Sequence, residues 1–288
     1  MEFLPSWLKP AQASSAVGLY LTSNMLLAVD ELQPLVLIER SIGAGETVTT
    51  ALRALIDEQQ WQGRRLHIAL NRRWYKQTQI EKPTMPDEEL QQALPWCMRD
   101  LVEQPVETLL FDYIDLPQGP AGQARIAVYS SEREPLAKLV QAITPQCDIA
   151  TIGIDELAMA NLLKPEIRGL LLHKVPGQEL TLTFIHQRQW HFSRTIRGFQ
   201  ALDDENMPVD QFVFDNLLLE LQRSIDYAVG QLKLSAPNNW YLALPQRVTP
   251  AITDAIRQVF DIKPESLTSD VFSPIGLPAL GILKEDLA

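Results

Sequence analysis

The hydrophobic pattern of this 288-residue chain opens twice in the same way, once in each half. Apolar runs with strand-like lengths and a helical-period segment predict three strands, a helix and a further strand in the first half: two strands joined by a tight polar turn within 16–30, then 35–40, 48–60 and 66–70. The second half repeats the order with strands and a long helix: 169–174, 180–185, 190–196, a helix with Leu218, Leu221, Ile225, Ala228 and Leu232 on one face, and 240–244. The repetition predicts a duplicated α/β architecture with two lobes.

The regular alternation of strands and helices is interrupted between about residues 72 and 124. A strand-like run ends at Pro83 and Pro86, and Pro95 interrupts a helical stripe, where a proline is expected to kink or restart the helix. We therefore expect a small subdomain inserted here. The first lobe is assigned to 11–165 and the second lobe to 166–288.

The first ten residues, 1–10, form an apolar arm bounded by prolines that carries Phe3, Leu4, Trp7 and Leu8. The favoured interpretation is an arm packed on its own domain. The alternative is a weak contact with a membrane surface or a partner, although Lys9 alone attracts anionic lipid little.

The net charge and the cysteine content argue against several classes of protein. The net charge is −11, from 36 acidic and 25 basic side chains, whereas a nucleic-acid binder needs a dense basic face. Cys97 and Cys147 match neither a disulfide framework nor a zinc spacing, which suits a reducing compartment. There is no secretory signal, and no apolar run approaches the roughly 20 residues that span a bilayer. A cytoplasmic protein is predicted.

Motifs for catalysis or metal binding are missing from the sequence. His67, His173, His186 and His191 lack the cysteine or acidic neighbours of a metal site. There is no phosphate loop or dinucleotide fingerprint. We predict no catalytic residues and no metal site.

Four stretches carry a resemblance to a known family: the hairpin 16–30, the segment 83–90 running on to Phe111-Asp112-Tyr113, the helix start 155–160, and 190–197 followed by 219–227. In order and spacing they resemble the PilM/MshI family of actin-like proteins of type IV pilus (MSHA) biogenesis, most closely MshI. The resemblance implies a two-lobed actin-like (duplicated ribonuclease-H-like) fold with a small inserted subdomain. It also implies a cytoplasmic scaffold, peripheral to the inner membrane.

Nucleotide-binding members of that family carry an aspartate and a glycine in the first hairpin, where this chain has Tyr20 and Thr22 before Ser23 and Asn24. The second hairpin offers His173 and Lys174 in place of an acid, and Gln246 and Arg247 stand where the family has glycines near the purine. Without the acids there is no anchor for Mg²⁺, and without the glycines side chains crowd the phosphates. The resemblance therefore predicts a pseudo-ATPase without a cofactor. Weak anion binding at Lys174 or Arg247 stays open.

Two alternatives remain. The first is an active ATPase or kinase of the actin superfamily that uses Asp30 or Asp155. The second is a component of a type II secretion platform similar to the cytoplasmic domain of GspL.

Arg72, Arg73, Trp74 and Tyr75 form a basic and aromatic cluster where the first lobe meets the inserted subdomain, and Trp96 lies on the subdomain's expected helix. Such side chains are typical of surfaces that grip peptides. Because PilM-like proteins accept the N-terminal tail of the bitopic inner-membrane protein PilN in a groove between these subdomains, the resemblance predicts a PilN-like tail as the partner. Ordinary hinge packing is the competing interpretation. The cytosolic pilus motor ATPase is a second partner under the same resemblance, and membrane association is expected only through partners or the N-terminal arm.

Overall fold

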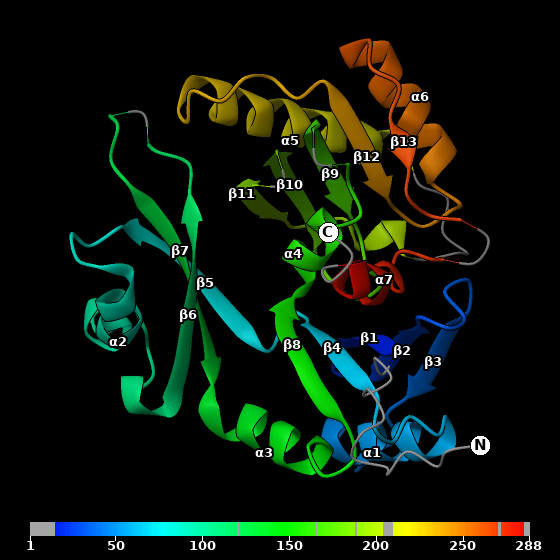
Figure 1. Cartoon of the computed structure of the whole chain (residues 1–288). Coiled ribbons are helices and arrows are strands. Elements are labelled where there is room, and N and C mark those ends of the chain that lie inside the picture. Colours follow the sequence, from blue (N-terminus) through cyan, green and yellow to red (C-terminus); the bar gives the residue numbers. More distant parts are fainter. Residues whose placement is uncertain are drawn as a thin grey trace, which may run out of the picture.

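The computed structural model describes residues 15–119, 121–164, 166–187, 189–203, 210–269 and 272–284. Two α/β lobes are stacked with two short helices, α4 and α7, between them, and a small subdomain lies at one side (Figure 1). The predicted arm at residues 1–10 lies outside the described residues. Among the described helices, none has the length and apolar character to cross a bilayer.

Lobe one is built on a five-stranded sheet of order β3-β2-β1-β4-β8. Its strands are β1 Ala16–Leu21, β2 Met25–Asp30, β3 Leu37–Ser41, β4 Arg65–Leu70 and β8 Asp148–Ile154. The first three strands are antiparallel neighbours, and β4 and β8 continue the sheet in parallel to β1. Helices α1 Val48–Glu58 and α3 Arg133–Ile143 bury their apolar residues against one face.

Lobe two repeats this plan with a sheet of order β11-β10-β9-β12-β13. Its strands are β9 Arg168–His173, β10 Leu180–His186, β11 Gln189–Ile196, β12 Asn239–Ala243 and β13 Glu265–Ser266. Helices α5 Gln211–Gly230 and α6 Thr249–Phe260 cover one face, and a single turn η3 Gln200–Leu202 precedes α5. The two sheets have the same order and strand directions, so the duplicated α/β architecture is confirmed.

The buried face of α5 differs from the predicted one. The buried residues are Leu217, Leu221, Ser224 and Ala228, while Leu218 and Ile225 are only partly buried and Leu232 lies beyond the helix. Polar Ser224 is buried because its hydroxyl donates to the Glu220 carbonyl (2.7 Å) and accepts from Arg194 (3.2 Å). A pattern of apolar residues alone misses this position.

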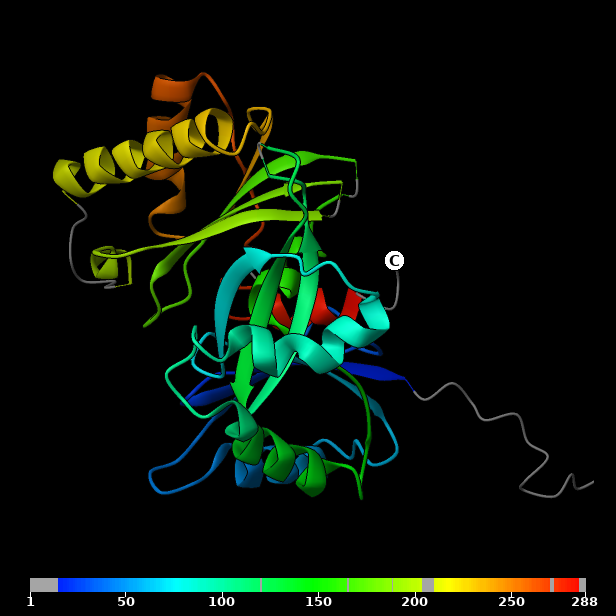
Figure 2. The same cartoon turned by 90° about the vertical axis from the view of Figure 1, so that its left-hand side faces the viewer.

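The small subdomain consists of a three-stranded sheet, β5-β7-β6, covered by one helix. Its elements are β5 Tyr75–Glu81, α2 Asp87–Met98, η2 Val106–Thr108, β6 Leu109–Leu116 and β7 Arg125–Glu132. The sheet runs past residue 124, the expected end of the insertion, because β7 is its central strand and pairs with both β5 and β6. Helix α2 continues through Pro95 for one more turn and ends at Met98. Figure 2 shows the subdomain in front of the junction between the lobes.

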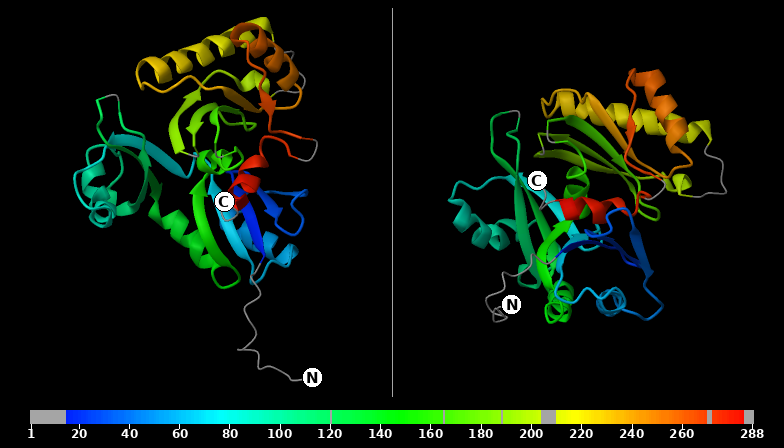
Figure 3. Two further views of the ribbon diagram at one scale, coloured as in Figure 1. Left: turned by 45° about the horizontal axis from the view of Figure 1, so that its top comes forward. Right: turned by 45° about the vertical axis from the view of Figure 1, so that its right-hand side comes forward.

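Helices α4 Asp155–Ala160 and α7 Leu277–Leu283 pack between the two sheets, as both views in Figure 3 show for α7. Although α7 ends the sequence assigned to lobe two, it packs on β1 and α4 of lobe one. Two glycines permit this approach: a Cβ atom at Gly18 would overlap the Ala279 carbonyl oxygen, and one at Gly281 would overlap the Ala158 carbonyl oxygen. The apolar core between the lobes thus includes residues of both sheets, α4 and α7.

Candidate functional site

Tyr20, predicted to replace an aspartate, lies on β1 with its side chain fully buried between the lobes. Its hydroxyl donates to Oδ2 of Asp155 at the start of α4 (3.0 Å). The same hydroxyl accepts from Nε2 of Gln178, in the β9–β10 turn of lobe two (3.0 Å). Tyr20 is therefore a direct polar link between the two lobes.

Asp155 is the centre of this arrangement. Its Oδ1 atom accepts from the Tyr75 hydroxyl (2.7 Å) and from the Glu156 backbone N–H (2.9 Å). Burial raises the pKa of Asp155 to about 7, with a further upward contribution from Glu156, while the tyrosine hydrogen bonds and Arg72 act in the opposite direction. Glu156, buried beside it, forms an ion pair with Arg72. We call Tyr20, Tyr75, Asp155, Glu156, Arg72 and Gln178 the inter-lobe network.

The turn between β1 and β2 is closed by its own side chain. Thr22 is buried, and its Oγ1 donates to the Met25 carbonyl (2.8 Å) and accepts from the Met25 N–H (2.9 Å). Ser23 and Asn24 are exposed at the tip. The Thr22 side chain therefore fills the turn at the position where the resemblance predicts the loss of a glycine.

Lys174 and His173 are both buried in lobe two. The Lys174 ammonium forms an ion pair with Asp203 (2.6 Å) and donates to the carbonyls of Gln178 (2.6 Å) and Val175 (3.2 Å). Nε2 of His173 lies 3.3 Å from the Pro274 carbonyl oxygen, and burial lowers the pKa of His173 to about 4. The lysine charge is neutralised inside the lobe, and the histidine is neutral at pH 7.

The other positions predicted for a nucleotide lie apart from this network. Gln246 and Arg247 are exposed after β12, and Arg247 donates to the Ala201 carbonyl (3.2 Å). Asp30, named for an active enzyme, lies at the end of β2 away from the turn and pairs with Arg64 (2.5 Å), which lowers its pKa despite burial. No group of three possible metal ligands occurs within the described ranges.

A hollow of about 360 Å³ lies between the small subdomain and lobe one. Its lining is mostly apolar and comes from both bodies: Leu110 to Ile114 of β6, Tyr129 of β7, Tyr75, Leu136 of α3, Ile152 to Ile154 of β8, and Leu157 of α4. We call this hollow the groove. Strand β6 pairs only with β7, and β8 pairs only with β4, so each presents an unpaired edge in the sheets as described. An extended peptide can add to such an edge through its main chain.

The predicted peptide-binding cluster is close to the groove but only partly within it. Arg72, Arg73, Trp74 and Tyr75 line a neighbouring hollow of about 140 Å³, and Tyr75 lines both. Trp96 lies on α2 with 76% of its side chain exposed and lines neither hollow. The groove residues of β6, β8 and α4 were not predicted from the sequence. The one signal for them was the apolar–polar alternation of Phe111-Asp112-Tyr113, which is typical of a strand with one exposed face.

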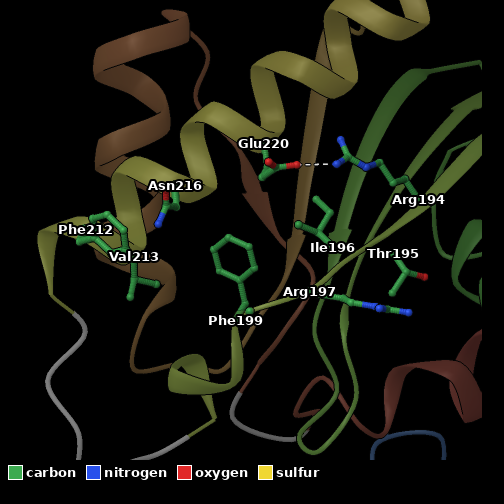
Figure 4. A pocket seen from close by; sticks show the side chains of 10 residues that line it. Arg194, Thr195, Ile196, Arg197, Phe199, Phe212, Val213, Asn216 and Glu220 are labelled. Carbon is green, nitrogen blue, oxygen red and sulfur yellow. Dashed lines mark hydrogen bonds and ion pairs between the residues drawn. The ribbon is translucent and has the colours of Figure 1, made fainter.

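Another hollow, of about 470 Å³, lies in lobe two between β11 and the first half of α5. Figure 4 shows Ile196 and Phe199 directed toward α5 and Arg194 reaching Glu220 (2.6 Å). Glu220 also pairs with Arg223 (2.5 Å). These ion pairs tie β11 to α5, and the side chains lining this hollow include no nucleophile paired with a base.

No protein-family model matches the chain, and neither does any curated protein. Solved structures do match. A chain of a "PilM-PilN type IV pilus biogenesis complex" has a TM-score of 0.69 and 16% identity, covering 94% of this chain and 98% of that one. A Bacteroides thetaiotaomicron protein with an actin-like ATPase fold has a TM-score of 0.55 and 10% identity, covering 93% and 96%. The chain has the actin-like fold.

A third actin-like neighbour is the cytoplasmic domain of EpsL, an inner-membrane component of the type II secretion system of Vibrio cholerae. Its TM-score is 0.53 at 16% identity, covering 95% of each chain. The similarity extends over nearly the whole length in all three cases.

Proposed function

We propose that this protein is a non-catalytic adapter of a pilus assembly platform of the MSHA/type IV class. On this proposal the groove binds the extended cytoplasmic tail of a PilN-like inner-membrane protein, which places the adapter in the cytoplasm at the inner membrane. The observation that carries the proposal is the apolar groove bounded by the unpaired edges of β6 and β8. The cytosolic pilus motor ATPase is the second partner to which the adapter would connect the tail.

The chemistry of the groove favours a peptide with alternating apolar side chains. Tyr75 and Tyr129 supply aromatic surface, and Ile114, Leu136 and Leu157 supply aliphatic surface, whereas Phe111 and Tyr113 at the β6 rim pack on the α2 side of the small sheet. Aromatic side chains in partly enclosed pockets dominate the energetics of many peptide sites. An edge strand adds main-chain hydrogen bonds that do not depend on sequence, and pockets for alternate side chains provide selectivity.

The proposed absence of catalysis is supported by the contacts of Asp155 and Lys174, which bond to other groups of the protein. A nucleotide site needs a carboxylate for Mg²⁺ and a free cation or backbone donors for phosphate. Asp155 instead accepts from two tyrosines and the Glu156 N–H, and Lys174 is paired with Asp203. The Tyr20 hydroxyl lies between Asp155 and Gln178 and bonds to both.

The proposal is tested by fluorescence anisotropy with a fluorescein-labelled PilN-type N-terminal tail peptide. Ile152→Lys places a charge on the β8 wall of the groove and should weaken binding at least tenfold. Val259→Lys is the matched control, because Val259 is an exposed apolar residue (59%) on α6 of lobe two. Wild-type affinity in a folded Ile152→Lys variant would refute the groove as the binding site.

A type II secretion platform is the second candidate, favoured by the full-length similarity to the EpsL cytoplasmic domain. The same anisotropy assay separates the two, with tail peptides from a pilus partner and from a secretion partner compared on one protein sample. The peptide that binds more tightly, and loses affinity in Ile152→Lys, identifies the platform.

A further inference from the structure

The inter-lobe network joins three bodies around the Asp155 carboxylate: lobe one and the small subdomain bond to it directly, and lobe two bonds to it through Tyr20. Tyr20 comes from the sheet of lobe one, Tyr75 from the first residue of the small subdomain's β5, and Gln178 from the β9–β10 turn of lobe two. The two tyrosine hydroxyls bond to opposite oxygens of Asp155, at 3.0 and 2.7 Å. A displacement of any one body therefore alters hydrogen bonds made by the other two.

Tyr75 also belongs to the groove. Its ring lines the groove wall and packs edge-on against Tyr129, with ring centroids 5.9 Å apart and planes at 69°. Ile154 and Leu157, which flank Asp155 along β8 and α4, line the same wall. The groove and the network thus share one tyrosine and one short stretch of backbone.

We propose that the network links occupancy of the groove to the contact between the lobes, with Tyr75 as the linking residue. A peptide that presses on the Tyr75 ring changes the position of its hydroxyl at Asp155, and the change reaches lobe two through Tyr20 and Gln178. The link is reciprocal, because a coupling between two sites acts equally in both directions. A partner that moves lobe two thereby changes the affinity of the groove. The peptide half of this inference rests on the proposed function.

The chain supplies its own matched control for Tyr75. Tyr129 is the neighbouring tyrosine of the same wall, and its buried hydroxyl has no hydrogen-bond partner. Tyr75→Phe and Tyr129→Phe each remove one hydroxyl from the groove wall, but only the first removes a bond to Asp155. An effect that is seen in Tyr75→Phe and not in Tyr129→Phe is therefore an effect of the inter-lobe network.

The first experiment measures amide hydrogen exchange in the protein alone. Tyr75→Phe should speed exchange in the turn 174–179 of lobe two by about fivefold, the equivalent of one lost hydrogen bond. Tyr129→Phe should leave exchange in that turn unchanged. Equal exchange in the two variants would overturn the link, whether or not any peptide binds.

The second experiment runs in the opposite direction. Gln178→Ala, which does not line the groove, should change the affinity of the labelled PilN-type tail peptide by about threefold to fivefold. Gln200→Ala is the control, because the Gln200 amide donates to Glu179 within lobe two (3.3 Å). If the wild type binds no peptide, the proposed function fails. The link is then decided by exchange in β6, which Gln178→Ala should speed and Gln200→Ala should not.

If Tyr75→Phe fails to fold, Gln178→Ala alone carries the exchange test. Unchanged exchange in β6 and unchanged peptide affinity in that variant would then refute the proposal.

Discussion

Asp155→Asn should stabilise the protein strongly at pH 8 and only slightly at pH 5. In the folded protein the pKa of Asp155 is raised to about 7, against 3.8 for an unperturbed aspartate. The folded state therefore keeps a proton that the unfolded chain releases, and stability declines as pH rises from about 4 to about 7. A pKa difference of about 3, at about 1.4 kcal/mol for each pKa unit, corresponds to roughly 4 kcal/mol of lost stability at pH 8.

Asparagine removes that ionisation while nearly keeping the shape of the side chain. Its amide NH₂ replaces one accepting oxygen, which costs about 1 kcal/mol in hydrogen bonding to Tyr20 or Tyr75. The expected result is a net gain of about 3 kcal/mol in unfolding free energy at pH 8. At pH 5 folded Asp155 keeps its proton but the unfolded chain has already released most of it, so a gain of about 1.6 kcal/mol offsets the hydrogen-bond cost and the net change is less than about 1 kcal/mol.

Urea unfolding at pH 5 and pH 8, followed by tryptophan fluorescence, measures both values. The control is Asp148→Asn on β8, an exposed aspartate whose substitution should change stability by little at either pH. The groups that face Asp155, namely Tyr20, Tyr75, Glu156 and Arg72, are unchanged in both variants. A stabilisation that is no larger at pH 8 than at pH 5 would refute the assignment of a buried, ionised Asp155.

Two further substitutions test the packing between and within the lobes. Gly281→Ala should destabilise the protein by more than about 3 kcal/mol in urea unfolding, because its methyl group would overlap the Ala158 carbonyl; an unchanged midpoint would contradict the close approach of α7 and α4. Lys174→Met should cost about 3 kcal/mol by leaving Asp203 unpaired, and adding Asp203→Asn should recover most of that loss. Equal stability of the single and double variants would count against this ion pair.

The fold was predictable because burial imposes periods that a single sequence displays. Alternation and apolar runs located the three opening strands of each lobe, and the repeat of that opening led to the two-lobed fold. The ends of elements and the pairing of strands were harder to predict. Strand β13, Glu265–Ser266, is only two residues long and is too short to show a period. Strand β7 was assigned outside the inserted subdomain, because its membership depends on pairing with β5 and β6 rather than on its own composition.

The contacts of the candidate site were not predictable from the sequence. The resemblance singles out Tyr20 and Lys174, yet nothing in their neighbours along the chain indicates their partners. Asp155 is 135 residues from Tyr20 and Gln178 is 158 residues from it, and only the folded topology brings them together. For the same reason Trp96, aromatic and well placed in sequence, lies on the outer side of α2 and does not line the groove.

Calorimetric titration with Mg·ATP should give no saturable heat up to about 1 mM. Binding would require Asp155 to exchange two tyrosine hydrogen bonds for a metal, and Lys174 to leave an ion pair of 2.6 Å for a phosphate. Each exchange costs on the order of 1–3 kcal/mol before any contact with nucleotide forms, and the closed turn at Thr22 removes the backbone donors that would repay it. Micromolar affinity that is lost in Asp155→Ala, and retained in Asp148→Ala, would establish an active nucleotide site and refute the adapter's lack of catalysis. Heat that is equal in all three proteins would report binding elsewhere on the surface and would leave the proposed lack of catalysis standing.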